Sequence, residues 1–508
     1  MSWLPSRLPF LKGPARSQVP IVTTDEIVPV HLFDSTTALQ SCILVWLFRF
    51  NERLDPDKLH DSLSRVFQRE GWRKLGGRYR RRSNDGKLEI HIPKPFTAQR
   101  PPVHFTRETF NTRMDEHPLA SKLPQATGKV TTFPGPRAFN ALAMGPGSPA
   151  TYDDLIYDDK PQFSLHVTNF TDGTLVGLGH SHMTADLLGL TAVIEAWCQE
   201  LAGESDKIKP FGGVEEDGMK GLYEPPTQEK HILAGKELQG SGLAYWGLRA
   251  VWQAKNARLA SRTLCIPKTT MEKLATQAKS QMTRQPSDTL PPDGRDAHFI
   301  SDGDVLAALL CRLNAQNQST MSRNIVTMMA LDPRTRAPSA FRTDVAYAGN
   351  SPTAVFFECS AQDAVDMSLG DLALCARQAI AAQATEEQMK AYAALSAESV
   401  RARNMNVMFG DRNMAFQLMS NWLKASLFEK IDFSPAIVEE ASSAARAASQ
   451  HKRGHPVYYH SADPGDVEGP YVMHLVVVMG ADHDGNLWMS CVLPETTWSD
   501  LVGFLDSL

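Results

Sequence analysis

The hydrophobic positions of this chain follow two periodicities, one typical of strands and one typical of helices. A dense run of Ile, Val, Leu, Trp and Phe occupies residues 39–50 and predicts a buried strand. Apolar side chains then recur at helical spacing over residues 56–67, directly after Asp55, a favourable N-cap, so we expect an amphipathic helix there. Residues 87–92 alternate polar with apolar side chains and predict a half-buried strand.

The middle of the chain contains the most regular segments. Residues 95–160 are rich in Pro, Gly, Ser and Thr and lack sustained periodicity, which predicts long surface segments with a few short elements. Two apolar segments, 163–167 and 174–180, flank an Asp-Gly turn and predict a β-hairpin. Apolar positions over residues 186–201 then lie on one helical face, and Gly203 suits the C-terminal cap of that helix.

A second series of elements follows residues 203–242, whose Gly, Pro, Lys and Glu content predicts an interdomain linker. Further strands are expected at residues 263–267, 323–331, 471–479 and 486–493, and further helices at residues 269–279, 304–313, 367–382, 386–397 and 498–508. Because both types of element alternate throughout, the predicted class is α/β or α+β.

The composition excludes several classes of protein. A chain of 508 residues is long enough for two or three domains, and its 42% hydrophobic and 21% charged residues are typical of a folded, soluble protein. The formal net charge of −5 provides no basic excess that would attract nucleic acid. No apolar run reaches the roughly 20 residues that span a bilayer. We therefore expect small-molecule partners, no nucleic acid and no membrane span.

The seven cysteines predict a reducing compartment. Their number is odd, and none forms a CxxC pair of the kind that binds metal or exchanges disulfides. Most have apolar neighbours, among which a free thiol behaves as a small buried hydrophobe, and Cys311 and Cys375 are expected in the core. Residues 1–30 lack the apolar segment of a signal peptide. A cytoplasmic protein is expected.

One motif, Gly-His-Ser-His-Met-Thr-Ala-Asp at residues 179–186, connects a predicted strand to a predicted helix. An imidazole there, that of His180 or His182, titrates near neutral pH and can remove a proton from a hydroxyl or amine that attacks an activated carbonyl. Asp186 could hold the ring or pair with an arginine that braces the loop. The spacing does not choose between the two histidines, because both would share one face of the strand.

Other chemistries have weaker support in the sequence. A zinc site formed by His180, His182 and Asp186 lacks a completing HExxH arrangement or a nearby cysteine. The sequence also contains no GxxxxGK[ST], GxSxG or GxGxxG motif, which disfavours ATP, serine-hydrolase and NAD chemistry. Because the HxxxD pattern is short, a purely structural role for these histidines is the remaining alternative.

Three groups of polar residues are expected to be structural. The basic run at residues 78–82 predicts a solvated strand edge, with phosphate binding as the alternative. Asp332, Arg334 and Arg336 are expected to form ion pairs at a strand end. Three histidines are expected on a polar loop: His451, His455 and His460.

Six segments, in one order along about residues 35–505, resemble the BAHD-type, CoA-dependent acyltransferases, in particular those of fungal secondary metabolism. The segments are residues 71–78 with 86–90, the HxxxD motif at 182–186, 304–309, 332–336, 347–350, and 420–422 with 431–433. Each segment alone is a weak signal, whereas six in the family's order are specific.

The resemblance implies an α/β fold of the chloramphenicol-acetyltransferase-like type. Two similar-sized domains, each with a mixed β-sheet flanked by helices, would enclose a tunnel at their interface. The expected boundaries are an N-terminal domain at residues 1–205 with the HxxxD motif, a crossover linker at 206–260 and a C-terminal domain at 261–508.

The resemblance also implies an activity. His182 would be the general base and Asp186 its orienting or structural partner, with no metal and no covalent enzyme intermediate. Acyl-CoA, with acetyl-CoA as the expected donor, would acylate a hydroxyl of a hydrophobic secondary metabolite, and the enzyme would be a monomer. His180 and Trp422 are the candidate substrate contacts.

The sequence departs from the family pattern at two places. Leu187 replaces the glycine that usually follows the aspartate, and Asp-Phe-Ser-Pro-Ala at residues 432–436 replaces the DFGWG box. Pro435 fixes φ and removes an N–H donor there. Two alternatives follow: an enzyme of this fold recruited for a CoA-independent cyclisation or rearrangement, and a non-catalytic binding protein.

Overall fold

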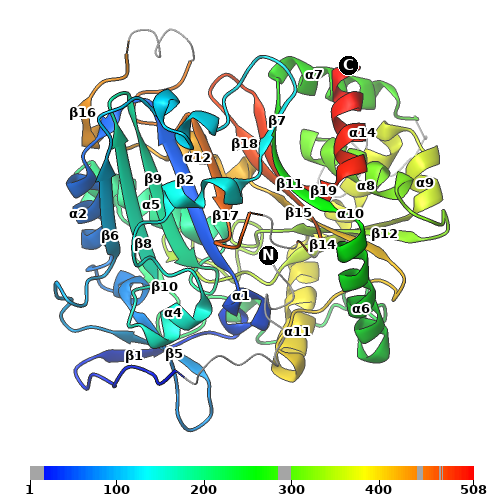
Figure 1. The fold of residues 1–508 in the computed structure, drawn as a ribbon. Coiled ribbons are helices and arrows are strands. Elements are labelled where there is room, and N and C mark those ends of the chain that lie inside the picture. Colours follow the sequence, from blue (N-terminus) through cyan, green and yellow to red (C-terminus); the bar gives the residue numbers. More distant parts are fainter. Residues whose placement is uncertain (1–15, 284–298, 443–449, 468–470, 472) are drawn as a thin grey trace.

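The computed structural model describes residues 16–283, 299–442, 450–467, 471 and 473–508. Two large β-sheets lie side by side, and helices cover them (Figure 1). Within the described residues, every helix is too short or too polar to serve as a membrane span.

The first sheet has five strands in the order β17-β2-β9-β8-β6. Their bounds are β2 Ile43–Phe50, β6 His104–Thr109, β8 Phe163–Phe170, β9 Gly173–Ser181 and β17 Tyr458–Ala462. The predicted hairpin is confirmed, because β8 and β9 pair antiparallel. Strand β2 begins at Ile43 rather than at residue 39, since the short helix α1 (Thr37–Gln40) precedes it.

Helices α2 (Pro56–Val66) and α5 (Leu187–Leu201) contact each other and belong to the core of the first sheet. Both were predicted, and Asp55 caps α2 by accepting two backbone N–H groups of its first turn. The indole N–H of Trp197 in α5 donates to the Leu59 carbonyl at 3.0 Å. This bond fixes α5, and with it the motif at its N-terminus, against α2.

The second sheet has seven strands in the order β14-β12-β15-β18-β19-β11-β7. Their bounds are β7 Thr131–Pro134, β11 Leu259–Ile266, β12 Asn324–Ala330, β14 Ala354–Ser360, β15 Ala415–Asn421, β18 His474–Ala481 and β19 Leu487–Pro494. Strand β15 pairs parallel with both of its neighbours and the other pairs are antiparallel, so the sheet is mixed. Its core includes residues of α7 Lys268–Ser280, α8 Asp302–Gln316, α10 Leu369–Gln383 and α14 Glu495–Asp506.

Each large sheet contains one strand from the other half of the chain. Strand β7 precedes the HxxxD motif but pairs with β11 of the second sheet. Strand β17 lies near the C-terminus but pairs along its whole length with β2 of the first sheet. The two sheets therefore hold each other's strands, while the domain boundaries at residues 205 and 261 stay a prediction.

The third sheet, β1-β5-β4, corrects the expectation for part of the basic run, since Arg81 and Arg82 are exposed as expected but Arg78 and Arg80 are not. Its strands are β1 Glu26–Pro29, β4 Arg78–Arg81 and β5 Leu88–Ile92. Arg78 and Arg80 are 0% and 3% exposed, so a solvated edge is wrong for both. Arg78 donates to the carbonyls of Gly76 and Pro101, and Arg80 pairs with Asp159, which leaves neither guanidinium free for a phosphate.

The expectation for the C-terminal histidines is also corrected in part. His455 lies on a bend, but His460 belongs to β17 and is 1% exposed. The side chain of His451 is 2% exposed and lies 3.3 Å from the Glu52 carboxylate. His460 is therefore a strand residue of the interior, whereas His451 lies on a segment without helix or strand, as expected, although its ring is buried.

Helix α6 (Gly240–Asn256) occupies the C-terminal part of the predicted linker, where no element was expected, and α11 (Glu386–Arg403) extends beyond its predicted end. The remaining strands and α-helices are short: β3 Arg53–Leu54, β10 Phe211–Gly212, β13 Ala346–Tyr347, β16 Ile437–Glu439, α3 Asn140–Ala143, α4 Tyr152–Tyr157, α9 Ala361–Asp366 and α12 Leu427–Lys430.

Candidate active site

His182 lies between a central strand and a helix. It follows β9 directly, and its backbone N–H donates to the Cys42 carbonyl at 2.8 Å, next to the start of β2. The residue is only 6% exposed. Burial lowers the pKa of its imidazole, so the ring is neutral and able to accept a proton at neutral pH.

Asn350, on the loop between β13 and β14, determines which nitrogen of His182 carries the proton. Its side-chain NH₂ group donates to the Asp34 carboxylate at 2.9 Å and to the His182 carbonyl at 2.8 Å. The amide oxygen, 2.9 Å from Nδ1 of His182, must therefore accept, and Nδ1 must carry the proton. The other ring nitrogen, Nε2, then presents a lone pair, as a general base requires.

Asp34 holds Asn350 in this orientation. Its carboxylate accepts the backbone N–H of Asn350 at 2.7 Å as well as the side-chain amide. The residue is 8% exposed, and burial raises the pKa of its carboxyl to about 6 against the bonds from Asn350, which lower it. Hydrogen bonds thus connect Asp34 to Asn350 and Asn350 to His182, so a residue from the second half of the chain links two residues from the first half.

Asp186 braces the loop and contacts an arginine, the second of the two arrangements expected from the sequence. Its carboxylate caps α5 through the Gly189 N–H at 2.8 Å and accepts the Ser351 N–H at 3.0 Å. It also pairs with Arg334 at 3.0 Å, and Arg334 pairs with Asp332 at 2.6 Å. Burial alone would lower the pKa of the Arg334 guanidinium, but the two carboxylates outweigh burial and raise it. The role of this cluster is structural, because both carboxylates are held by the same guanidinium.

His180 differs from His182 in having both ring nitrogens occupied by protein partners. The Trp46 indole donates to its Nε2 at 3.3 Å, so Nδ1 carries the proton and donates to the Ser181 carbonyl at 2.9 Å. The residue is 2% exposed, and burial lowers its pKa to about 4. The two histidines share one motif, but His182 is the one with a nitrogen available for substrate.

Trp422 follows β15 and lies where the two large sheets meet. Its ring centroid is 5.0 Å from that of Trp46 in β2, and its indole N–H donates to the Ser420 hydroxyl at 2.8 Å. The contact between the two tryptophans joins the sheets, and the role of Trp422 toward an acceptor stays a prediction.

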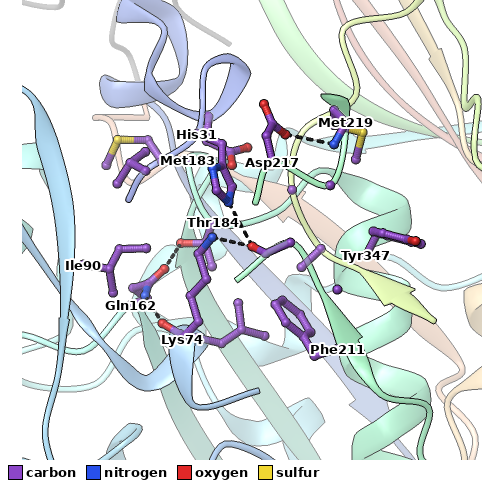
Figure 2. Close-up of a pocket in the computed structure, with 18 of the residues that line it drawn as sticks. His31, Lys74, Ile90, Gln162, Met183, Thr184, Phe211, Asp217, Met219 and Tyr347 are labelled. Carbon is purple, nitrogen blue, oxygen red and sulfur yellow. Dashed lines mark hydrogen bonds between the residues drawn. The ribbon is translucent and has the colours of Figure 1, made fainter. Parts of the chain in front are cut away.

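A cavity of about 30 Å³ is lined in part by Met183 and Thr184 of the motif (Figure 2). Asp34 and Lys74 also line it, and the Lys74 ammonium donates to the Gly213 carbonyl at 2.6 Å. Burial lowers the pKa of Lys74 to about 8. A volume of this size accommodates about two water molecules. It is too small for an acceptor of metabolite size.

The described residues contain no group of three or more His, Cys, Asp and Glu side chains arranged to hold a metal ion. The contacts of two of the three proposed zinc ligands also argue against a zinc site. Trp46 occupies Nε2 of His180, and Arg334 occupies the carboxylate of Asp186.

Comparison with known proteins identifies the family. Residues 150–447 match the model of the Transferase family. The O-acetyltransferase PaAT-2 of Phomopsis amygdali is 32% identical over 94% of this chain and 97% of its own length, and the acetyltransferase adrJ of Penicillium rubens is 32% identical over 94% and 95%. The crystal structure of F. sporotrichioides TRI101 complexed with coenzyme A and T-2 has a TM-score of 0.61 at 14% identity, over 94% of this chain and 97% of that one.

This chain therefore belongs to the Transferase family of BAHD-type acyltransferases, in the branch of fungal secondary metabolism, and it has the fold of that family. The resemblance expected from the six segments is confirmed. Two residues of the site had no role assigned from the sequence. Asn350 was one residue of a family segment, and Asp34, between Phe33 and Ser35 ahead of a buried strand, belonged to no motif.

Proposed function

We propose that this chain is a CoA-dependent O-acetyltransferase that transfers an acetyl group from acetyl-CoA to a hydroxyl of a hydrophobic secondary metabolite. The observation that carries the proposal is Nε2 of His182, which has no hydrogen-bond partner among the described residues and whose lone pair follows from the proton that Asn350 holds on Nδ1. The names of the two relatives support acetyl as the acyl group, and that of PaAT-2 supports oxygen as the acceptor atom.

In the proposed reaction, Nε2 of His182 removes the proton of the acceptor hydroxyl as its oxygen attacks the thioester carbonyl. The tetrahedral intermediate collapses, the carbon–sulfur bond breaks, and the proton on Nε2 passes to the sulfur of CoA. As the imidazolium forms, Nδ1 keeps its bond to the Asn350 oxygen, and the ring does not need to rotate during the cycle. The ion pair of Asp186 with Arg334 holds the loop during both steps.

The test is acetyl transfer by the purified chain to a panel of hydrophobic alcohols, followed by the mass of the product and by release of free CoA thiol. His182→Ala should lower kcat/KM by about 10²–10⁴-fold, the usual contribution of a general base, with an unchanged circular dichroism spectrum. His104→Ala, which removes a histidine from the outer strand β6, is the matched control and should keep full activity. Full activity of the folded His182→Ala protein would refute the assignment of the base.

The same assay separates the proposal from a CoA-independent cyclisation or rearrangement. A product that forms at the same rate with and without acetyl-CoA, and that carries no acetyl group, would replace the proposed function by that alternative.

We also propose that the enzyme acts in the cytoplasm and as a monomer. All seven cysteines are free, which supports a reducing compartment.

A further inference from the structure

Helix α6 carries an apolar stripe that faces outward. Tyr245, Leu248 and Trp252 are 50%, 76% and 65% exposed, and their spacing places them on one side of the helix. The other side packs on the protein, where the ring of Trp246 meets that of Phe416 edge-on at 5.7 Å. Figure 1 shows α6 on the outside of the molecule, beyond the second sheet. The described residues therefore leave half or more of each of these three side chains uncovered.

The chain around this stripe is basic, although the whole protein is acidic. No Asp or Glu lies between Glu237 and Glu272, whereas the net charge of the chain is −5. The Lys and Arg residues of this segment are Arg249, Lys255, Arg258, Arg262 and Lys268.

Cations remain available at both ends of the stripe. Arg262 pairs with Glu495 and Lys268 lies 4.0 Å from Glu272, but Lys255 and Arg258, at the C-terminal end of α6, are exposed and form no ion pair with the described residues. At the other end, the exposed guanidinium of Arg412 lies 5.7 Å from the centroid of the Tyr245 ring.

We propose that α6 is a docking element for the surface of an anionic lipid bilayer. Tyr245, Leu248 and Trp252 would enter the interfacial region, and Lys255, Arg258 and Arg412 would contact acidic headgroups. An outward face of aromatic and aliphatic side chains flanked by cations is the pattern that lies in a membrane interface. A protein partner is disfavoured, because three side chains on a convex helix provide far less than the roughly 800 Å² per partner of a stable protein interface.

The docking role goes beyond acetyl transfer, and vesicle binding can be measured whether or not the protein transfers acetyl groups. The full-length protein is floated with vesicles of phosphatidylcholine alone and of phosphatidylcholine mixed with phosphatidylserine. We expect binding to the mixed vesicles that weakens as salt is added, and little binding to the neutral ones. Activity on a water-soluble alcohol without vesicles serves as the measure of an intact site.

Two double variants separate the apolar from the charged contribution. Leu248→Gln with Trp252→Gln keeps good helix formers, and should lower the vesicle partition coefficient by about tenfold or more. Lys255→Gln with Arg258→Gln should lower it by about tenfold on mixed vesicles only. Val438→Gln, which changes another exposed apolar residue (57%) on β16, should leave partitioning unchanged.

Unchanged binding by both double variants would overturn the proposal, as would equal binding to neutral and mixed vesicles. It would also be overturned if the protein showed no vesicle binding but a dimer in sedimentation that the Leu248→Gln/Trp252→Gln variant abolished, because α6 would then be an interface between copies. Loss of catalytic activity in His182→Ala with normal vesicle binding would leave the docking role intact.

Discussion

The carboxylate of Asp34 influences His182 through one intervening amide. If it is ionised, it accepts both N–H groups that Asn350 presents, and the Asn350 oxygen then has a single orientation toward Nδ1 of His182. Its desolvation works against ionisation, which is why burial raises its pKa to about 6. The site thus retains a buried charge that weakens the fold at neutral pH in exchange for a fixed imidazole.

This cost predicts a pH-dependent difference in stability between the wild type and Asp34→Asn. Since the carboxyl pKa is about 6 in the folded state and 3.8 for an aspartate in the unfolded chain, the folded state binds the proton more tightly between these values. The wild-type free energy of unfolding should therefore fall, relative to the variant, as pH rises through this window, by up to about 3 kcal/mol. Urea unfolding at about pH 4 and about pH 7 measures it.

Lys74 and Asp217, the other charged groups near Asp34, are present in both proteins, but Asp34 raises the pKa of Lys74, so the variant lowers that pKa as well. An identical pH dependence of the two proteins would contradict the assignment. The variant should also lose part of its activity with unchanged KM for acetyl-CoA, because Oδ1 of Asp34 accepts both N–H groups of Asn350 and a neutral amide oxygen accepts them more weakly than a carboxylate.

Arg334 provides a second test at the residue scale. Arg334→Ala leaves the Asp186 and Asp332 carboxylates partly buried without their cation, and should lower the free energy of unfolding by about 2–4 kcal/mol. It should also lower kcat, because the Asp186 loop carries His182. The matched control is Arg342→Ala, which breaks the exposed pair with Asp344 and should change neither quantity measurably. Equal effects of the two substitutions would show that the buried pair does not brace the loop.

The position of helix α5 depends on a glycine that lies two residues beyond the family's usual one. Position 187 is Leu, but Gly189 in the first turn of α5 approaches the second half of the chain so closely that an added Cβ would lie 2.0 Å from the Ala348 carbonyl oxygen. Ala348 precedes Asn350 by two residues. The close approach of α5 therefore sets the position of the loop that orients His182.

Gly189→Ala and Gly503→Ala should therefore have opposite effects on stability, although both place alanine in a helix. At Gly503 in α14 the added Cβ meets no atom within 4 Å, and the substitution should stabilise by about 0.5–1 kcal/mol through backbone entropy. At Gly189 the clash should reverse that sign and lower activity by displacing Asn350. Thermal unfolding and kcat of the two variants check this. Stabilisation of both variants would show that the loop containing Ala348 moves aside without lowering the free energy of unfolding.

The elements that the sequence predicted correctly are those whose signals are local. Asp55 caps α2, and the helix at 186–201 and the hairpin before it combine a turn or cap with clear periodicity. Strands β14 and β15 were not predicted, because both sides of each strand are covered and their alternation is weak. The burial of Arg80 could not be predicted for a different reason. Its partner Asp159 lies far away in sequence.

The catalytic motif was predictable to the level of two histidines and no further. The two histidines differ in one hydrogen-bond partner: His182 contacts Asn350, and His180 contacts Trp46. Each partner lies more than a hundred residues away in sequence from its histidine. Such pairings depend on how the two sheets meet. That arrangement follows from the whole fold rather than from any segment. The family resemblance therefore implied His182 as the base, which periodicity alone could not.

At the scale of the whole molecule, the two large sheets are joined by chain as well as by contact. Strand β17 closes the edge of β2 in the first sheet, and β7 closes the edge of β11 in the second. The altered box at residues 432–436 belongs to the same connection. Phe433 is 1% exposed, its ring lies 4.6 Å from that of Trp197 and 5.4 Å from that of Phe50, and the neighbouring Ala436 carbonyl accepts the Asp55 N–H at 2.7 Å. The box thus packs into the first sheet's core.

This exchange predicts that neither half of the chain folds alone, although each contains most of a sheet. A fragment of residues 1–257 lacks β17 and Phe433, which leaves the edge of β2 open and the rings of Phe50 and Trp197 uncovered. The complementary fragment 258–508 lacks β7. We expect no cooperative thermal transition for either fragment, and a restored transition with acetyltransferase activity after the two are co-expressed and purified together. A cooperative transition for the fragment 1–257 alone would contradict this prediction. It would show that the first sheet folds without β17, and the two halves would then be independent domains.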